Sequence, residues 1–299
     1  MDSKKRAVCD YEGSDYQERF WDQGERQYED RAEAVALKKL LPPTGQRLLD
    51  VGAGAGRNVP RYGGYSQIVL VDYARSQMER AQEQVGEDQR CLFVVADAYH
   101  LPFAPYVFDV VTMIRTLHHM VDPLAALQQV RAVSQPGAIF VLEFANKRNL
   151  KAILRWITHM QDWNPFEEGT IEFAAMNFNF HPKAVRGWLG EAQFKVQQQL
   201  TVSHFRLALL KRLVPLRVLV GLDSVAQKTG RFWQLTPSVF IQSVAFGENN
   251  GGGDALFWRC PVCGSLSLEE GESGLKCQDC SRIWSYRDGI YDFRTSLES

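Results

Sequence analysis

Short apolar runs alternate with amphipathic stretches along the first half of the chain. The apolar runs cover residues 47–51, 68–72, 91–95, 108–113 and 138–142, and Val, Ile, Leu and Phe dominate them. Residues 76–85 and 123–133 have apolar side chains at helical spacing, and residues 28–41 form another helical pattern that ends at Pro42 and Pro43. Strands buried on both faces are apolar throughout, and alternation of such strands with helices is typical of a parallel sheet. The pattern predicts an α/β fold.

The second half of the chain departs from this alternation. Residues 144–180 are an insertion rich in Trp and Phe, residues 183–191 form a helical pattern, and residues 194–196 and 239–244 predict two closing strands. The closing strands bring the expected total to seven, so we expect a doubly wound, mostly parallel seven-stranded sheet with helices on both faces. The rings of the insertion are either the hydrophobic core of a lid or a cover for an apolar acceptor.

Residues 204–220 combine basic and apolar side chains. From Lys183 to Arg231 the chain has five Arg and four Lys against Glu191 and Asp223, a formal net charge of +7. One hypothesis is a helix pair packed on the sheet with its charged stems outward. The others are peripheral contact with an anionic membrane surface and contact with phosphate backbones.

Residues 248–254 contain three consecutive glycines and no apolar side chain. This composition predicts a flexible linker between a body at residues 1–247, with its core at 30–247, and a tail at residues 255–299.

Composition excludes several classes of protein. Hydrophobic residues make up 45% of the chain and charged residues 23%, as in globular proteins with a packed core. The apolar runs are too short to span a bilayer, and the charged start of the chain lacks the apolar stretch of a secretory signal. We therefore expect a cytoplasmic protein. The formal net charge of −1 provides no general attraction to nucleic acid.

A glycine-rich turn follows the first predicted strand. Gly52, Gly54 and Gly56 alternate with small residues, and Arg57 stands where a dinucleotide-binding pattern requires glycine. Asp72 ends the second strand, where a carboxylate can accept hydrogen bonds from ribose hydroxyls, and Asp97 follows the third strand. Taken alone, each aspartate could be a helix cap, but their order behind successive strands favours a nucleotide site.

The runs 48–56, 71–78, 96–103 and 117–123 resemble class I S-adenosylmethionine (SAM)-dependent methyltransferases. The resemblance is closest to the branch that includes the ubiquinone and menaquinone biosynthesis methyltransferases. It implies a Rossmann-like methyltransferase fold and SAM as cofactor. It further implies that the glycines line the methionine portion, that Asp72 holds the ribose, and that Arg115 lies near the sulfonium. The other residues with implied roles are Asp50 at the loop or the amino group, Tyr73 and Met78 near the adenine, and Asp97 and Ala98 at the adenine edge.

His118 and His119 follow the fourth strand, near the expected position of methyl transfer. One of them is a candidate base for a hydroxyl or carboxyl acceptor, and the alternative is that one packs or caps the next helix. The sequence assigns no catalytic residue.

Four cysteines occur as two C-x₂-C pairs separated by thirteen residues, namely Cys260, Cys263, Cys277 and Cys280. This spacing is typical of a structural, tetrahedral Zn²⁺ site, and a domain this short needs such a site for stability. Together with residues 285–293, the pairs resemble the small zinc-ribbon protein that activates several tRNA, rRNA and translation-factor methyltransferases. The ribbon either stabilises the catalytic body or recruits a macromolecule. Its five Lys and Arg against seven Asp and Glu argue against phosphate binding.

The sequence thus favours a SAM-dependent methyltransferase for a small-molecule or lipid-like acceptor. One alternative is methylation of tRNA, rRNA or a translation protein, and another is a SAM-binding, zinc-ribbon regulatory module without turnover.

Overall fold

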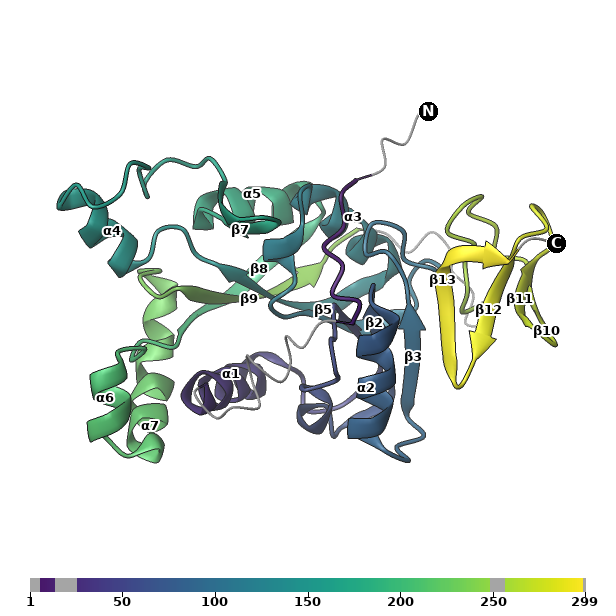
Figure 1. The fold of residues 1–299 in the computed structure, drawn as a ribbon, viewed down its shortest axis with the longest axis horizontal. Helices are drawn as coiled ribbons and strands as arrows, with labels where there is room; N and C mark the ends of the chain where they lie inside the picture. The colour runs from purple at the N-terminus through teal and green to yellow at the C-terminus, as the bar shows by residue number, and fades with distance from the viewer. Residues whose placement is uncertain (1–5, 14–25, 248–255, 298–299) are drawn as a thin grey trace.

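The computed structural model describes residues 6–13, 26–247 and 256–297 (Figure 1). The linker predicted at residues 248–254 lies outside these residues. No helix in the described ranges is long and apolar enough to cross a membrane.

Seven strands form the part of the sheet that the alternating pattern predicts. They are β1 Gly45–Val51, β2 Tyr65–Asp72, β3 Cys91–Val95, β4 Phe108–Met113, β5 Ser134–Ala145, β8 Phe194–Val202 and β9 Ser238–Ala245. Within the described chain they lie in the order β3-β2-β1-β4-β5-β9-β8, and β9 runs antiparallel to both of its neighbours. The other pairs are parallel, which confirms the predicted mostly parallel sheet. The strand order reverses between β1 and β4, where sheets of this kind bind ligands at the carboxyl ends of their strands.

Helices cover both faces of this sheet, as Figure 1 shows. On one face, α1 Gln27–Leu40 and α2 Arg75–Val85 bury apolar side chains such as Leu37 and Ala81. On the other face, α3 Pro123–Val133 and α5 Pro182–Glu191 bury residues such as Leu127 and Leu189. The carboxylate of Asp122 caps α3 by accepting a hydrogen bond from the Ala125 N–H group at 3.1 Å. The predicted doubly wound arrangement is therefore confirmed.

The insertion and the basic segment form smaller elements. The insertion contains α4 Leu150–Ile157 and the hairpin of β6 Ile171–Ala174 and β7 Asn177–Asn179. The basic segment forms α6 Ala208–Leu213 and α7 Leu216–Ala226, followed by a 3₁₀ turn, η4 Gln227–Arg231.

The expected helix pair is thus present, but its packing differs from the expectation. Leu219 of α7 is buried in a cluster with side chains of α1, β8 and β9, whereas α6 buries no residue. The outer side of the pair carries apolar as well as charged side chains.

The cysteine-rich tail continues the main sheet. Its strands are β10 Leu268–Gly271, β11 Gly274–Cys277, β12 Ile283–Arg287 and β13 Ile290–Leu297. β13 pairs in parallel with β3, so the sheet has eleven strands across the described residues (Figure 1). Edge pairing of this kind has no local sequence signal, because the paired strands lie far apart in the chain.

Aromatic side chains pack against one another at the junction between the tail and the body. The ring of Trp258 stacks on that of Phe103, with a centroid separation of 5.6 Å, and Phe257 meets both Phe103 and Phe108 edge-on. The Ala104 N–H group donates to the Phe257 carbonyl at 2.9 Å, which joins the two backbones. The tail therefore packs on the body through both main-chain and aromatic contacts.

Candidate active site

The glycine loop turns sharply after β1. At Gly52 φ is +72°, and a Cβ atom there would lie 2.2 Å from Thr116 Oγ1, so only glycine fits. Gly54 also has a positive φ, of +53°, and a Cβ atom there would have no atom nearer than Gln77 Oε1 at 4.0 Å. At Gly56 a Cβ atom would instead lie 3.3 Å from Ala81 Cβ in α2. Gly52 thus permits the close approach of the loop to Thr116, Gly54 leaves an open surface, and Gly56 permits close packing of the loop on α2.

The carboxylate of Asp72 holds this loop in place. Asp72 Oδ2 accepts a hydrogen bond from the Gly54 N–H group at 2.9 Å, and Oδ1 accepts one from the Ala74 N–H group at 3.1 Å. Burial raises the pKa of Asp72, and these two hydrogen bonds oppose that effect. Each oxygen keeps a lone pair for a ligand hydroxyl.

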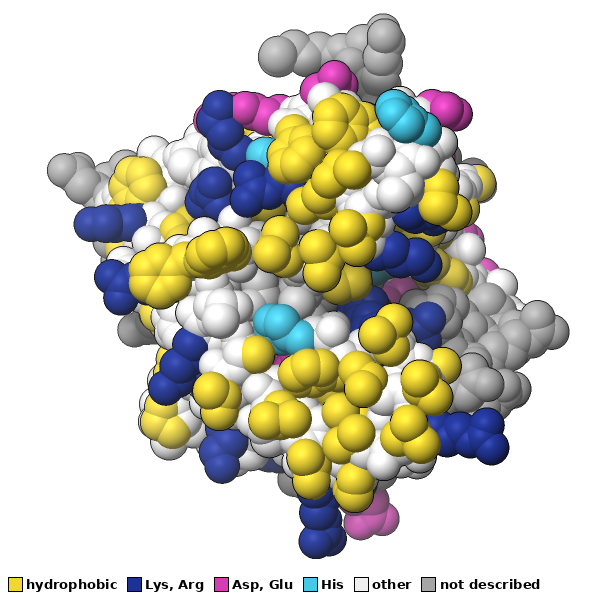
Figure 2. All heavy atoms as spheres, turned by 90° about the vertical axis from the view of Figure 1, so that its left-hand side faces the viewer, with side chains coloured by type: hydrophobic (Ala, Val, Ile, Leu, Met, Phe, Trp, Pro, Cys, Tyr) yellow, Lys and Arg dark blue, Asp and Glu magenta, His cyan; other side chains and the backbone are white. Residues whose placement is uncertain are grey.

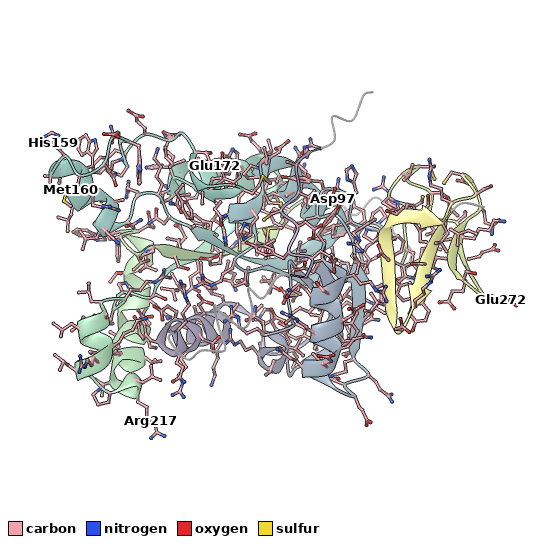
Figure 3. The ribbon with its side chains drawn as sticks, viewed as in Figure 1. Asp97, His159, Met160, Glu172, Arg217 and Glu272 are labelled. Carbon is pink, nitrogen blue, oxygen red and sulfur yellow. The ribbon has the colours of Figure 1, made fainter. Side chains whose placement is uncertain are left out.

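A cavity with about 1060 Å³ of atom-free space opens beside the loop. Seven of the predicted residues line it, namely Gly52, Gly54, Asp72, Tyr73, Asp97, Ala98 and Arg115. Figure 3 places Asp97 near the described N-terminal segment. The loop and the ends of β2, β3 and β4 thus converge on one cavity.

Three predicted residues, Asp50, Gly56 and Met78, are not part of this lining. Asp50 is buried beneath the loop and accepts hydrogen bonds from Thr112 Oγ1 at 2.8 Å and from the Tyr62 hydroxyl at 3.0 Å. Burial raises the pKa of Asp50 to about 6 despite these bonds. Met78 is fully buried in the core between α2 and the sheet. The cavity geometry gives no support to a cofactor contact of Met78.

The side chain of Arg115 is held by Glu33 of α1. Arg115 Nε donates to Glu33 Oε1 at 2.9 Å, and Arg57 Nη2 donates to Glu33 Oε2 at 3.0 Å. The Arg115 N–H group donates to Glu143 Oε2 at 3.0 Å. Burial alone would raise the pKa of Glu33, but the two guanidinium groups outweigh it and hold the pKa at about 2. The positive charge of Arg115 is therefore paired with a carboxylate at the cavity.

Glu33→Gln is expected to lower the free energy of unfolding by about 3 kcal/mol at pH 7, because two guanidinium groups lose a buried partner. A carboxyl group whose pKa is depressed in the folded state stabilises the fold above its unfolded pKa. This contribution disappears as the pH falls from about 4.5 toward 2. Urea unfolding at pH 7 and pH 3 measures both effects.

Glu79 provides the matched control, because its carboxylate is half exposed and pairs with Arg75 within one helix. Glu79→Gln should change the stability by less than about 1 kcal/mol. Equal losses in the two variants would contradict the role of Glu33.

The N-terminal segment, residues 6–13, is a part of the site that the sequence did not reveal. Its Val8, Cys9 and Tyr11 line the cavity. Glu12 accepts hydrogen bonds from the N–H groups of Arg75 at 2.9 Å and Ser76 at 3.0 Å, which fastens the segment to the start of α2. The segment has no hydrophobic period, and its contacts join residues more than sixty positions apart, so no local pattern could have predicted them.

His119 also lines the cavity. Its Nδ1 lies 3.0 Å from the Met176 carbonyl, which can only accept, so Nδ1 carries the proton. Nε2 then accepts from the Tyr11 hydroxyl, 3.1 Å away. Burial lowers the pKa of both His118 and His119, so both imidazoles are neutral near pH 7. Neither histidine caps α3, because Asp122 does so.

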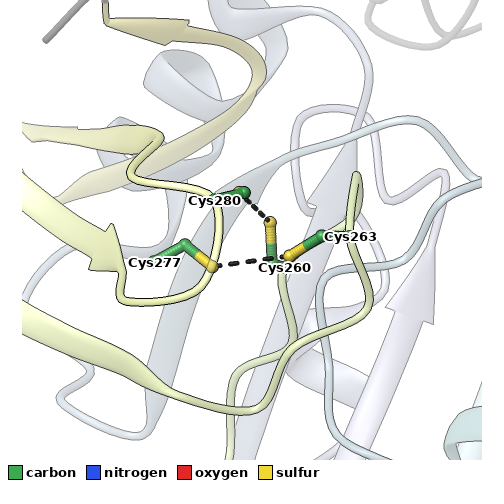
Figure 4. A group of neighbouring side chains, drawn as sticks. All are labelled: Cys260, Cys263, Cys277 and Cys280. Carbon is green, nitrogen blue, oxygen red and sulfur yellow. Dashed lines mark hydrogen bonds between the residues drawn. The ribbon is translucent and has the colours of Figure 1, made fainter.

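The four paired cysteines form a second candidate site (Figure 4). All four Sγ atoms lie within 4.8 Å of one another. The Cys260–Cys280 and Cys263–Cys277 Sγ separations are 3.7 and 3.5 Å, too long for disulfide bonds. Thiolates at about 2.3 Å from a tetrahedral Zn²⁺ would lie about 3.8 Å apart. The cysteine cluster therefore fits a zinc ion with all four positions filled by protein.

Known proteins resemble this chain in its first half and in its fold. Residues 49–142 match the family model described as a methyltransferase domain. An O-methyltransferase from Penicillium expansum, cnsE, is 34% identical over 109 residues, covering 35% of this chain and 40% of that protein. Demethylmenaquinone methyltransferase from Clavibacter sepedonicus is 32% identical over 113 residues, covering 37% and 46%. The chain thus spans less than half the length of these curated relatives.

Solved structures extend the likeness over most of the chain. A chain from the complex of the Haloferax volcanii Trm112 methyltransferase activator with a methyltransferase superposes with a TM-score of 0.55 at 16% identity. The match covers 79% of this chain and 96% of that one. Magnesium protoporphyrin IX methyltransferase from Synechocystis PCC 6803 gives a TM-score of 0.51 at 15% identity, covering 75% and 87%. The chain has the Rossmann-like methyltransferase fold.

Proposed function

We propose that the protein is a SAM-dependent methyltransferase that acts on a small-molecule or lipid-like acceptor. The observation that carries the proposal is the convergence of the glycine loop, Asp72 and Asp97 on one cavity in this fold. The curated relatives support the acceptor class, since they include demethylmenaquinone and 27-O-demethylrifamycin SV methyltransferases.

The residues around the cavity suit a bound SAM molecule. Asp72, Asp97 and Ala98 all line the cavity. Asp72 would accept hydrogen bonds from the ribose hydroxyls through its remaining lone pairs, and Asp97 and Ala98 would face the adenine edge. At Gly54, where a Cβ atom would meet open space, the absence of a side chain would let the backbone approach the methionine portion, and Gly52 lets the loop pass close to Thr116. When bound, SAM supplies a methyl group on a sulfonium, which is a good leaving group. Glu33 keeps the guanidinium of Arg115 paired, so that its charge does not oppose the sulfonium.

His119 is the candidate base for an acceptor hydroxyl. In the neutral ring, Nε2 has the lone pair that can accept a proton. In this structure Nε2 accepts a hydrogen bond from the Tyr11 hydroxyl. An acceptor hydroxyl that replaces the Tyr11 hydroxyl could donate its proton to Nε2.

His119→Gln is expected to lower kcat by about 10²-fold or more and to leave the Kd for SAM unchanged, because the proposed role of the ring is proton removal from the acceptor and not cofactor binding. Single-turnover assays and calorimetry measure the two effects separately. Tyr11→Phe is the control, because it removes the hydroxyl and leaves the base in place. An unchanged kcat in His119→Gln would exclude this base.

We also propose that Cys260, Cys263, Cys277 and Cys280 bind a structural Zn²⁺ and that residues 255–299 form a ribbon domain on the methyltransferase body at residues 1–247. The contacts between β13 and β3 and between Trp258 and Phe103 support a stabilising role for the ribbon.

Calorimetry with SAM tests the cofactor, and labelled methyl transfer into a lysate lacking the enzyme tests the acceptor. We expect label in the lipid or aqueous small-molecule fraction. Label confined to RNA or protein would favour the macromolecular alternative. SAM binding without label in any fraction would favour a regulatory module without turnover.

A further inference from the structure

Two groups of helices expose large apolar side chains at one end of the molecule. On α6, α7 and the segment after η4, six such side chains are more than half exposed, namely Leu209, Leu213, Leu222, Val225, Phe232 and Trp233. On α4 and the turn after it, Leu150, Leu154, Ile157 and Met160 are also more than half exposed. Isolated exposed leucines are ordinary, but a group of this size marks an interaction surface.

The two groups belong to one face, here named the apolar face and defined by residues 149–160 and 207–233. The Leu150 N–H group donates to the Leu235 carbonyl at 2.8 Å, and Asn146 Nδ2 donates to the Gln234 carbonyl at 2.9 Å. The start of α4 is thereby joined to the chain that follows Trp233. Figure 2 shows both groups of apolar side chains on the side turned toward the viewer. Figure 3 places Met160 and Arg217 at this end of the molecule and Glu272 of the ribbon at the opposite end.

The charged side chains of the apolar face are basic. In residues 207–233 the exposed charged residues are Arg212, Arg217, Lys228 and Arg231. The single acidic residue there, Asp223, is buried and accepts hydrogen bonds from Tyr28 and from the Gln227 side chain. In residues 149–160 the chain has Lys151 and Arg155 and no acidic residue. Figure 2 shows Lys and Arg among the apolar side chains of this face.

We propose that the apolar face docks on an anionic lipid membrane. Exposed Trp, Phe and Leu side chains on surface helices insert at the boundary between headgroups and acyl chains, and Lys and Arg beside them pair with anionic headgroups. This combination of apolar and basic side chains suits neither a nucleic acid nor a second copy of the chain. A nucleic acid would leave the leucines in water, and a symmetric contact between two copies would bring like charges together. Docking of this kind extends the proposed function by making the methyl acceptor a membrane lipid. This identification of the acceptor rests on the proposed function.

The test is sedimentation of the full chain with vesicles at low salt. We expect binding to vesicles of phosphatidylcholine and phosphatidylglycerol in equal parts, and much weaker binding to pure phosphatidylcholine. Val225→Glu is expected to weaken binding at least about tenfold, because it removes an inserted side chain and adds a repelled charge. Val225 is 74% exposed, so the substitution disturbs no core packing.

Leu256→Glu is the matched control, because Leu256 is also exposed but lies outside the apolar face. It should bind the vesicles like the unmodified chain. Absence of binding to the anionic vesicles, equal binding to neutral ones, or equal weakening by both substitutions would overturn the proposal. So would a dimer in light scattering that Val225→Glu converts to a monomer, since the face would then join two copies.

Calorimetry with SAM in the absence of vesicles separates this proposal from the proposed function. Val225→Glu should bind SAM like the unmodified chain. If the chain bound vesicles but did not bind SAM, the docking proposal would stand and the proposed methyltransferase function would be refuted.

Discussion

Cys277→Ser is expected to abolish the binding of about one equivalent of zinc and to unfold the ribbon. The free energy of structural zinc binding, about 10 kcal/mol or more, exceeds what the core of so short a domain provides. Because β13 pairs with β3 and Trp258 covers Phe103, loss of the ribbon also exposes a sheet edge and an aromatic surface. We expect Tm to fall by about 10 °C, with aggregation of the unfolded protein. Elemental analysis and thermal denaturation measure the two effects.

Cys91→Ser is the control for this variant. Cys91 begins β3 and lies outside the cysteine cluster, and burial raises the pKa of its thiol to about 11, so it is neutral like the serine hydroxyl. This variant should keep its zinc and most of its stability. Retention of one equivalent of zinc and an unchanged Tm in Cys277→Ser would refute the metal site.

The cysteine-rich tail also reaches the rim of the cavity. The guanidinium of Arg294 lies 5.6 Å from the centre of the Tyr73 ring, and its Nη1 lies 3.3 Å from Glu12 Oε2. Tyr73 lines the cavity, and Glu12 fixes the N-terminal segment to the start of α2. Unfolding of the ribbon is therefore expected to weaken SAM binding in addition to lowering stability.

The sequence predicted the elements whose signals are local. The strands at residues 91–95 and 108–113 and the helix at 123–133 have the predicted bounds, because each is set by its own apolar pattern and its own turn residues. The cysteine cluster was also predictable, since each of the two C-x₂-C pairs is defined by its own internal spacing.

The contacts between distant segments were not predictable. The parallel pairing of β13 with β3 and the passage of residues 6–13 along the cavity join segments that share no pattern. Met78, which the family likeness predicts near the adenine, does not line the cavity. Met78 and Ala81 are three positions apart on α2, so both face the sheet and are buried in its core. Helical phase alone indicates that Met78 faces the sheet core.

Asp72→Ala is expected to raise the Kd for SAM by about 100-fold or more. Two hydrogen bonds from ribose hydroxyls to a carboxylate contribute about 1.5–3 kcal/mol each, and each 1.4 kcal/mol corresponds to about tenfold in Kd. Alanine also removes the acceptors of the Gly54 and Ala74 N–H groups, so the loop that lines the cavity loosens. Calorimetry measures the Kd, and urea unfolding measures the accompanying loss of stability.

Asp109→Ala separates ligand binding from loop support. Like Asp72, Asp109 accepts two backbone hydrogen bonds, from the N–H groups of Gln46 at 2.8 Å and Arg47 at 2.7 Å, but it does not line the cavity. Both variants should therefore lose comparable stability, and only Asp72→Ala should lose affinity for SAM. If both variants weakened SAM binding equally, the effect at Asp72 would be one of backbone support. If neither did, the ribose would not bind at this carboxylate.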